Sequence, residues 1–233
     1  MKKFYTAVGV TESGIHYSVL LDGKPIRTPA KNELLLPTKM LAELVAAEWD
    51  TELELLDTST MYMTRLANTT IDWVLEARVQ LIEEVTEYIN TDLVCHRARK
   101  PEVLRQRQAV VWDPLVFWFN GKYGVDLTVT TELLPVAQPS RATEKIEEFC
   151  AGLNNYALAA LHQITTMCGS IVIGLAVADE ELDGVSAWSA SLIDEFYQLD
   201  KWGADSEVTE RHDRLRTEID AATRFLNTAR LGS

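Results

Sequence analysis

The spacing of apolar residues changes once along this chain, close to Thr38, and this change limits the folds that the chain can adopt. Before Thr38, short segments rich in β-branched and aromatic residues alternate with turn residues, which is typical of short antiparallel strands. After it, apolar residues recur at every third or fourth position, as on one face of an α-helix. The chain is therefore predicted to be an α+β protein, with a small β-rich N-terminal domain followed by a mostly α-helical C-terminal domain.

The predicted domain boundary lies near residue 68. Residues 1–68 are expected to form the β-rich domain, which includes one helix, and residues 69–233 the helical bundle domain. One β-like insert is predicted in the second part, near residues 125–135, as a strand or an extended crossing segment. No repeat and no low-complexity linker interrupts the sequence.

The first part of the chain reads as hairpins. FYTAVGV and IHYSVLL flank the turn-like TESG, and Asp22-Gly23 can supply the positive φ angles of a tight turn. The next stretch, LDGKPIRTPAKNELLLP, carries polar residues that a phosphate site could use: Lys24, Arg27, Thr28 and Lys31. Since no phosphate-binding motif surrounds them, they are interpreted as turn and edge residues of a scaffold.

Helix boundaries are predicted from capping residues and prolines. The predicted N-caps are Thr38, Ser140, Asn154 or Asn155, Ser186 and Ser206. One helix is expected to start after Lys100-Pro101, and another to restart at Asp113-Pro114. A long helix is expected over residues 70–92. It is expected to bury a stripe of apolar residues, which are Ile71, Leu75, Ile82, Val85 and Ile89. SIVIGLAVADEEL is apolar on most sides and is predicted to be a central buried helix.

The formal net charge of the 233 residues is −13. This argues against a nucleic-acid partner, because neutralising phosphates requires clustered Lys and Arg. It also argues against binding to an anionic membrane surface, whereas it permits a basic protein partner.

The three cysteines, Cys95, Cys150 and Cys168, lie far apart and form no CxxC pair. Neither a zinc knuckle nor a disulfide framework is therefore predicted, and a reducing compartment fits best. The start of the sequence has no signal or transit pattern. The best apolar run, GSIVIGLAVA, is much shorter than the roughly 20 residues of a membrane-spanning helix. We expect a soluble, cytoplasmic protein.

Catalytic motifs are missing from the sequence. There is no GxxxxGK[ST] or GxGxxG for nucleotides, no HExxH for zinc and no GxSxG nucleophile elbow. The one conceivable cluster is Asp92, Cys95 and His96, because residues four apart share a helical face. A metal site needs three or more convergent ligands, so a hydrogen-bonded pair of Asp92 with His96 or an arginine at a helix end is favoured.

Two further segments have two interpretations each. Met61, Tyr62 and Met63 could form an adaptable contact surface, although core filling is favoured. Trp202, followed by Gly203 and acidic residues, has the composition of a protein-binding patch. The same acids, Asp205 and Glu207, would equally suit a helix N-terminus.

The ordered set LDGKPIRTPAKNELLLPT, LAELVAAEWD, MTRLANTTID, YINTDLVCHRA, WDPL and DEFYQLDKWGADSE resembles a known family from about residue 4 to about residue 227. It is the family of assembly chaperones that bind the alpha subunit of the F-type ATP synthase head. The resemblance implies a chaperone without catalysis or cofactor, acting on free alpha until beta joins. It also implies an α+β fold. We also expect the protein to be a monomer. Family members occur in mitochondria, where the matrix is their compartment, and in bacteria, where a cytoplasmic location is expected.

The resemblance also implies roles for single residues. The acidic residue after the WG motif matters to the family's function; Glu207 is the best match, Asp205 is the alternative, and Trp202 belongs to the same patch. The residues expected to be structural are Trp49, Arg65, Asp72 and Arg97, the last three in ion pairs.

The sequence is therefore consistent with three hypotheses about function. The first is an alpha-subunit chaperone. The second is a small enzyme that uses Asp92, Cys95 and His96. The third is a generic helical adaptor for another partner.

Overall fold

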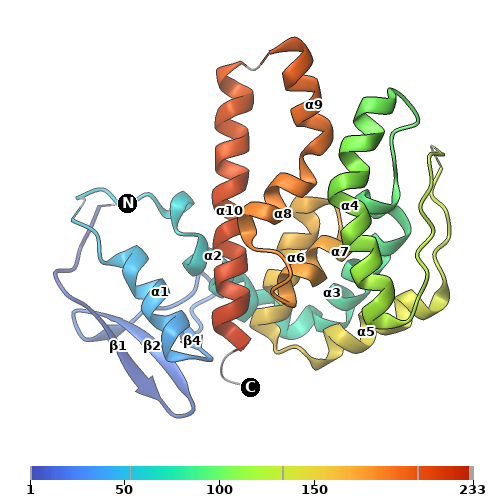
Figure 1. The fold of residues 1–233 in the computed structure, drawn as a ribbon. Coiled ribbons are helices and arrows are strands. Elements are labelled where there is room, and N and C mark those ends of the chain that lie inside the picture. The colour runs from blue at the N-terminus through green and yellow to red at the C-terminus, as the bar shows by residue number, and fades with distance from the viewer. Residues whose placement is uncertain (1, 53, 133, 204, 231–233) are drawn as a thin grey trace. The chain divides into compact units, whose positions relative to one another are not determined.

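A computed structural model describes residues 2–52, 54–132, 134–203 and 205–230 (Figure 1). A small antiparallel sheet near the N-terminus is followed by helices, which confirms the predicted α+β class. The chain divides into two compact units. Unit 1 comprises Met1–Arg78, Leu153–Ala160 and Arg224–Ser233, and unit 2 comprises Val79–Gly152 and Leu161–Thr223.

The sheet of unit 1 is built around its second strand, which pairs antiparallel with the other three. The strands are β1 (Val8–Ser13), β2 (His16–Leu21), β3 (Lys24–Pro25) and β4 (Leu35–Leu36). Leu21 pairs with Lys24, so Asp22 and Gly23 form a two-residue turn. Their φ angles, +48° and +78°, are both positive, as the mirror-image turn that matches strand twist requires. The predicted hairpin turn is confirmed.

Helix α1 (Lys39–Trp49) packs on this sheet. The Thr38 hydroxyl accepts a hydrogen bond from the Leu41 amide at 3.1 Å, so the predicted cap is correct. The last residue of the helix, Trp49, is buried, and its indole N–H donates to the Thr64 hydroxyl at 3.1 Å. The Tyr5 hydroxyl donates to the Trp49 carbonyl at 2.6 Å. Trp49 therefore ties the end of α1 to the N-terminal segment and to α2 (Tyr62–Thr69).

The residue before α2 makes no capping hydrogen bond with its side chain. Instead, the side chain of Glu48, which belongs to α1, caps α2. Its carboxylate accepts hydrogen bonds from the amides of Met63 and Thr64 at 2.7 and 2.8 Å. These amides belong to the first turn, whose N–H groups have no partner within the helix. Met61 and Met63 are both 5% exposed, so they fill the core as the favoured interpretation had it.

The chain then passes through a π-helical turn, η2 (Thr70–Val74), into α3 (Leu75–Glu87). A π turn contains one residue more than an α turn and so rotates the following helix about its axis. The predicted buried stripe is wrong at this point: Leu75 is 61% exposed, and Leu81, which was not predicted, is fully buried. Val85 and Ile89 are buried as predicted.

The elements that follow α3 are short 3-10 turns and longer helices. They are η3 (Tyr88–Thr91), η4 (Leu93–Cys95), α4 (Glu102–Tyr123), α5 (Ser140–Gly152), α6 (Asn155–Cys168), α7 (Ile171–Ala178), α8 (Gly184–Ser191), α9 (Ile193–Trp202) and α10 (Ser206–Arg230). Unit 1 contains one more 3-10 turn, η1 (Thr58–Thr60). No helix among the described residues is long and apolar enough to cross a membrane.

Helix α7 is the centre of unit 2. Each of its residues is buried, as predicted for SIVIGLAVA. The Ser170 hydroxyl accepts from the Ile173 amide at 3.0 Å and donates to the Asp92 carboxylate at 2.7 Å. Asp92, which has no exposed surface, also accepts from the amides of Val94 and Val172, both at 3.0 Å. A single buried carboxylate thus holds the start of α7 and the turn η4.

Three predicted boundaries differ from the structure. Asp113-Pro114 does not restart a helix, because α4 runs through it. Pro114 lies on an exposed face, where the Val110 carbonyl that loses its helical N–H partner can bind water. Asp183 and Asp205, instead of Ser186 and Ser206, cap α8 and α10, since a carboxylate is at least as good an acceptor for first-turn amides.

The predicted β-like insert is extended rather than a strand. Between α4 and α5, the described residues form one isolated bridge, in which Thr130 pairs parallel with His96. The Gln138 side chain pairs with both main-chain groups of Thr128, accepting from the amide at 2.8 Å and donating to the carbonyl at 2.9 Å. These bonds satisfy part of the backbone that a sheet would otherwise satisfy.

Replacing Trp49 with Arg is expected to lower the free energy of unfolding by about 3–5 kcal/mol, because it buries an unpaired charge and removes a large core side chain. Urea unfolding followed by circular dichroism measures this. Trp202→Arg is the matched control: Trp202 is 80% exposed, so a change within about 0.5 kcal/mol is expected. Equal losses in both variants would contradict the burial of Trp49.

Asp92→Asn is expected to destabilise the protein by about 1–3 kcal/mol. The NH₂ group of Asn would replace one carboxylate oxygen, and it would then face an N–H or O–H donor that has lost its acceptor. The control is Asp183→Asn, at the exposed cap of α8, where Asn caps as well as Asp. Chemical denaturation of both variants at pH 7 provides the comparison, and a stable Asp92→Asn protein would show that the buried network is dispensable.

The effect of Asp92→Asn should depend on pH. Burial raises the pKa of Asp92 from 3.8 to about 6. Because the folded pKa lies above the unfolded one, the stabilisation from this group is fully present below pH 4 and is lost as the pH rises through 6. The Asn variant has no such titration. The difference in free energy of unfolding between the wild type and the Asn variant should therefore become smaller from pH 4 to pH 6 in the same unfolding assay.

Candidate partner-binding site

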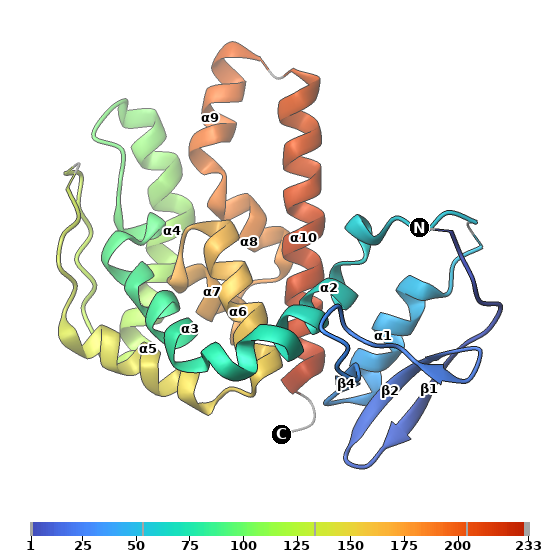
Figure 2. The ribbon, with the colours of Figure 1, turned by 180° about the vertical axis from the view of Figure 1, so that it is seen from behind.

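Helices α9 and α10 run side by side and are joined at one end by a short connection (Figures 1 and 2). Helix α9 ends at Trp202, and the Gly203 amide donates to the Leu199 carbonyl at 2.8 Å. Gly203 has φ +82° and ψ 164°, a conformation that is essentially open only to glycine. The connection is therefore shaped by this residue.

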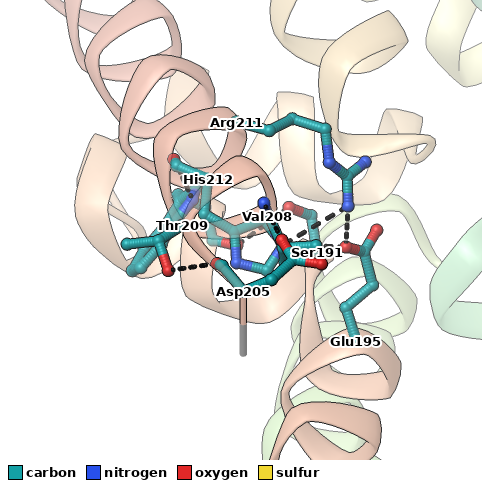
Figure 3. A network of polar contacts seen from close by, with 8 residues as sticks. Ser191, Glu195, Asp205, Val208, Thr209, Arg211 and His212 are labelled. Carbon is teal, nitrogen blue, oxygen red and sulfur yellow. Dashed lines mark hydrogen bonds and ion pairs between the residues drawn. The ribbon is translucent and has the colours of Figure 1, made fainter. Parts of the chain in front are cut away.

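Asp205 starts α10. Its carboxylate accepts from the Val208 amide at 2.8 Å, and its carbonyl accepts from the Thr209 hydroxyl at 3.0 Å (Figure 3). The first of these bonds satisfies an amide of the first helical turn, which has no partner within the helix. Asp205 is thus engaged by its own helix, which favours the capping interpretation for this residue.

Trp202 and Glu207 are the exposed members of the predicted patch. The Trp202 side chain is 80% exposed, although a tryptophan of a soluble protein usually buries most of its surface. Glu207 lies in the first turn of α10 and is exposed. The structure therefore brings Trp202, Asp205 and Glu207 to one end of the helix pair, and leaves Trp202 and Glu207 accessible to a partner.

Below this end, polar contacts connect the two helices (Figure 3). Glu195 of α9 accepts from Arg211 and lies 2.7 Å from the Nε2 atom of His212, both on α10. His212 is 5% exposed, and its carbonyl accepts from the Trp188 indole at 3.1 Å. These partly buried contacts hold the first turn of α9 against α10 and so support the pair that carries the exposed end.

The sequence analysis missed Glu195, Arg211 and His212. Glu195 lies 16 and 17 residues before its partners, so no local spacing connects them. The charge pattern of α9 and α10 would have identified the pair only once the two helices were known to be neighbours.

A second set of contacts joins α9 to α4. Arg107 forms an ion pair with Asp200 and lies 5.4 Å from the Tyr197 ring centre. These residues are partly exposed, and such ion pairs contribute little to stability by themselves. They neutralise Asp200, whereas Glu207 forms no ion pair within the part of the chain that the structure describes.

The alternative enzyme site does not form. The Asp92 carboxylate accepts hydrogen bonds from the Ser170 hydroxyl and from amides at the starts of η4 and α7. Burial raises the pKa of the Cys95 thiol to about 12. The His96 ring lies 3.0 Å from the Asp92 carbonyl, not from its carboxylate. The residues sit in 3-10 turns rather than on one α-helical face. Among the described residues, no three His, Cys, Asp or Glu side chains converge as metal ligands.

Of the residues expected in ion pairs, Arg97 forms one, with Asp113 at 2.9 Å. Asp72 instead accepts hydrogen bonds from neutral donors, with the Thr28 hydroxyl at 2.6 Å and the Ala30 amide at 3.0 Å. Arg65 donates to the Ser59 carbonyl at 2.9 Å. The expectation of ion pairs is thus corrected for Asp72 and Arg65: a turn offers peptide and hydroxyl groups within reach, and they satisfy these charges.

Comparison with known proteins agrees with the fold and with the resemblance. A family model described as ATP12 chaperone protein matches residues 2–120. The mitochondrial protein atp12 of Schizosaccharomyces pombe is 25% identical over 207 residues, which are 82% of this chain and 70% of that protein.

Solved structures are closer. The crystal structure of Atp12 from Paracoccus denitrificans superposes with a TM-score of 0.92 at 34% identity, covering 98% of both chains. A protein from Agrobacterium tumefaciens gives a TM-score of 0.90 at 35% identity, over 97% of this chain and 85% of that one. This chain belongs to the ATP12 family, whose members are assembly chaperones of ATP synthase and not enzymes.

Proposed function

We propose that this protein is the chaperone of the ATP synthase alpha subunit, and that it binds free alpha through the end of the α9–α10 pair. The observation that carries the proposal is the exposure of Trp202 and Glu207 at one end of a pair of helices that Glu195 connects. Exposed tryptophans at a rigid site are typical anchors of protein interfaces. A neighbouring carboxylate would select a basic or hydrogen-bond-donating group on the partner.

The physical need for such a chaperone follows from ring assembly. A subunit that alternates with another in a ring has flanks that are obligate interfaces, and these are large and apolar. Left uncovered, such flanks favour aggregation. A protein that covers the flank of alpha until beta arrives would prevent this loss. Release would need no ATP, because the better partner displaces the weaker one by mass action.

The proposal extends to the place and state of action. The similar solved structures come from bacteria, and the S. pombe relative is a mitochondrial protein. We propose the bacterial cytoplasm for this chain, with a monomer as the active form. Sedimentation of the purified protein tests the second point.

The direct test of the function is capture followed by displacement. Purified protein is mixed with isolated alpha, the complex is isolated by size exclusion, and beta is added. We expect a complex with alpha that dissociates when beta is added. If alpha is not bound, while another protein of the native lysate is enriched reproducibly, the chain is an adaptor for that protein.

Glu207→Lys is expected to weaken alpha binding about tenfold or more, which corresponds to about 1.4 kcal/mol, because it reverses the charge of the proposed contact. The melting temperature should fall only slightly, since a cation in the first turn opposes the helix dipole by about 0.3–1 kcal/mol. Titration calorimetry with alpha and thermal unfolding measure the two effects.

Glu210→Lys is the matched control, because Glu210 is also exposed and lies one turn further along α10. It should bind alpha as the wild type does. A large loss of stability in Glu207→Lys with unaltered binding would instead make Glu207 a structural residue of the helix start.

A further inference from the structure

Helix α4 of unit 2 is apolar on its outer face. Val103, Val110 and Phe117 are 55%, 76% and 80% exposed, and they follow one another at intervals of seven residues. Residues seven apart lie nearly above one another on an α-helix. Pro114 and Gly121 fall on the same face and are exposed as well. We call the face formed by these five residues the α4 stripe.

The opposite face of the same helix is the buried one. Trp112 and Phe119 have no exposed surface, and Leu115 is 7% exposed. A helix at the surface of a soluble protein normally pairs one apolar face with a polar one. Helix α4 also carries exposed apolar side chains on its outer face, where a surface helix normally has polar ones.

One charged residue lies on the α4 stripe: Arg107 is four residues after Val103 and three before Val110, and it is paired with Asp200. Asp113, on one flank of the stripe, is paired with Arg97. The nearest charges are therefore already neutralised within unit 2. A partner that covered the stripe would meet an apolar ridge without an uncompensated charge, so its own contact surface should be apolar and uncharged.

We propose that the α4 stripe is a docking surface for the client of this chaperone, and that it takes a client helix with an apolar, uncharged face. The inference rests on the proposed function, and it adds a second contact to the α9–α10 end. A straight ridge with a seven-residue spacing suits a helix crossing at a shallow angle, where side chains of one helix fill gaps of the other. The obligate flank of a ring subunit is the kind of surface that offers such a face.

The area of the stripe argues against a second copy of this chain as the occupant. Three side chains of this size offer on the order of 300 Å², whereas a stable interface buries about 800 Å² on each partner. A homodimer resting on the stripe alone would be too small to persist. The stripe suits one part of a larger contact, as two sites on one client would provide.

The test uses the double variant Val110→Gln/Phe117→Gln, which keeps the net charge and introduces a good helix former. Its control is Ile15→Gln, which removes an equally exposed apolar side chain (88% exposed) from a hairpin turn. The affinity of each full-length protein for purified alpha is measured by titration calorimetry. We expect the double variant to bind alpha about tenfold or more weakly, with an unchanged melting temperature, and the control to bind as the wild type does.

The outcomes separate this inference from the proposed function. Wild-type protein that does not bind alpha would overturn the proposed function and, with it, the inference. Wild-type binding that the double variant retains in full would overturn the inference alone. The wild type could also sediment as a dimer and the double variant as a monomer, with alpha binding unchanged. This result would assign the stripe to a second copy of the chain and would also overturn the inference.

Discussion

The carboxylate of Asp92 is the interaction on which unit 2 depends. It is fully buried, and it accepts hydrogen bonds from the turn η4, from Ser170 and from the start of α7. The central helix α7 is apolar on all sides, so its first amides lie where water cannot reach them. A buried acceptor is then required, and the two side-chain oxygens of Asp92 supply it. The other helices of unit 2 pack around an element that this group fixes.

The proposed binding end of the molecule is built differently. Helices α9 and α10 expose apolar and acidic side chains at their connection, and polar contacts of Glu195 with Arg211 and His212 join them further down. The supporting contacts and the exposed residues are thus separate groups. A chaperone that has to release its client benefits from this separation, because the contact surface can be of moderate strength without weakening the frame.

Features set by local sequence were predictable. The Thr38 cap, the Asp22-Gly23 turn and the buried helix α7 depend on neighbouring residues or on one clear pattern. Leu75 and Pro114 were not predictable in this way. The π turn before Leu75 shifts the helical phase, and Pro114 is tolerated because its face is exposed. At the site, the exposure of Trp202 fits the predicted patch, but the contacts of Glu195 required the fold.

The conformation of Gly203 has a consequence for which residues around it can be exchanged. At φ +82° and ψ 164° the main chain itself sets the direction in which the helix pair turns back, and no side chain has to be packed to hold it. Trp202 and the acids beyond it can then be exchanged for other residues without rebuilding the bend. One glycine therefore lets the side chains at this end be substituted while the bend itself stays the same.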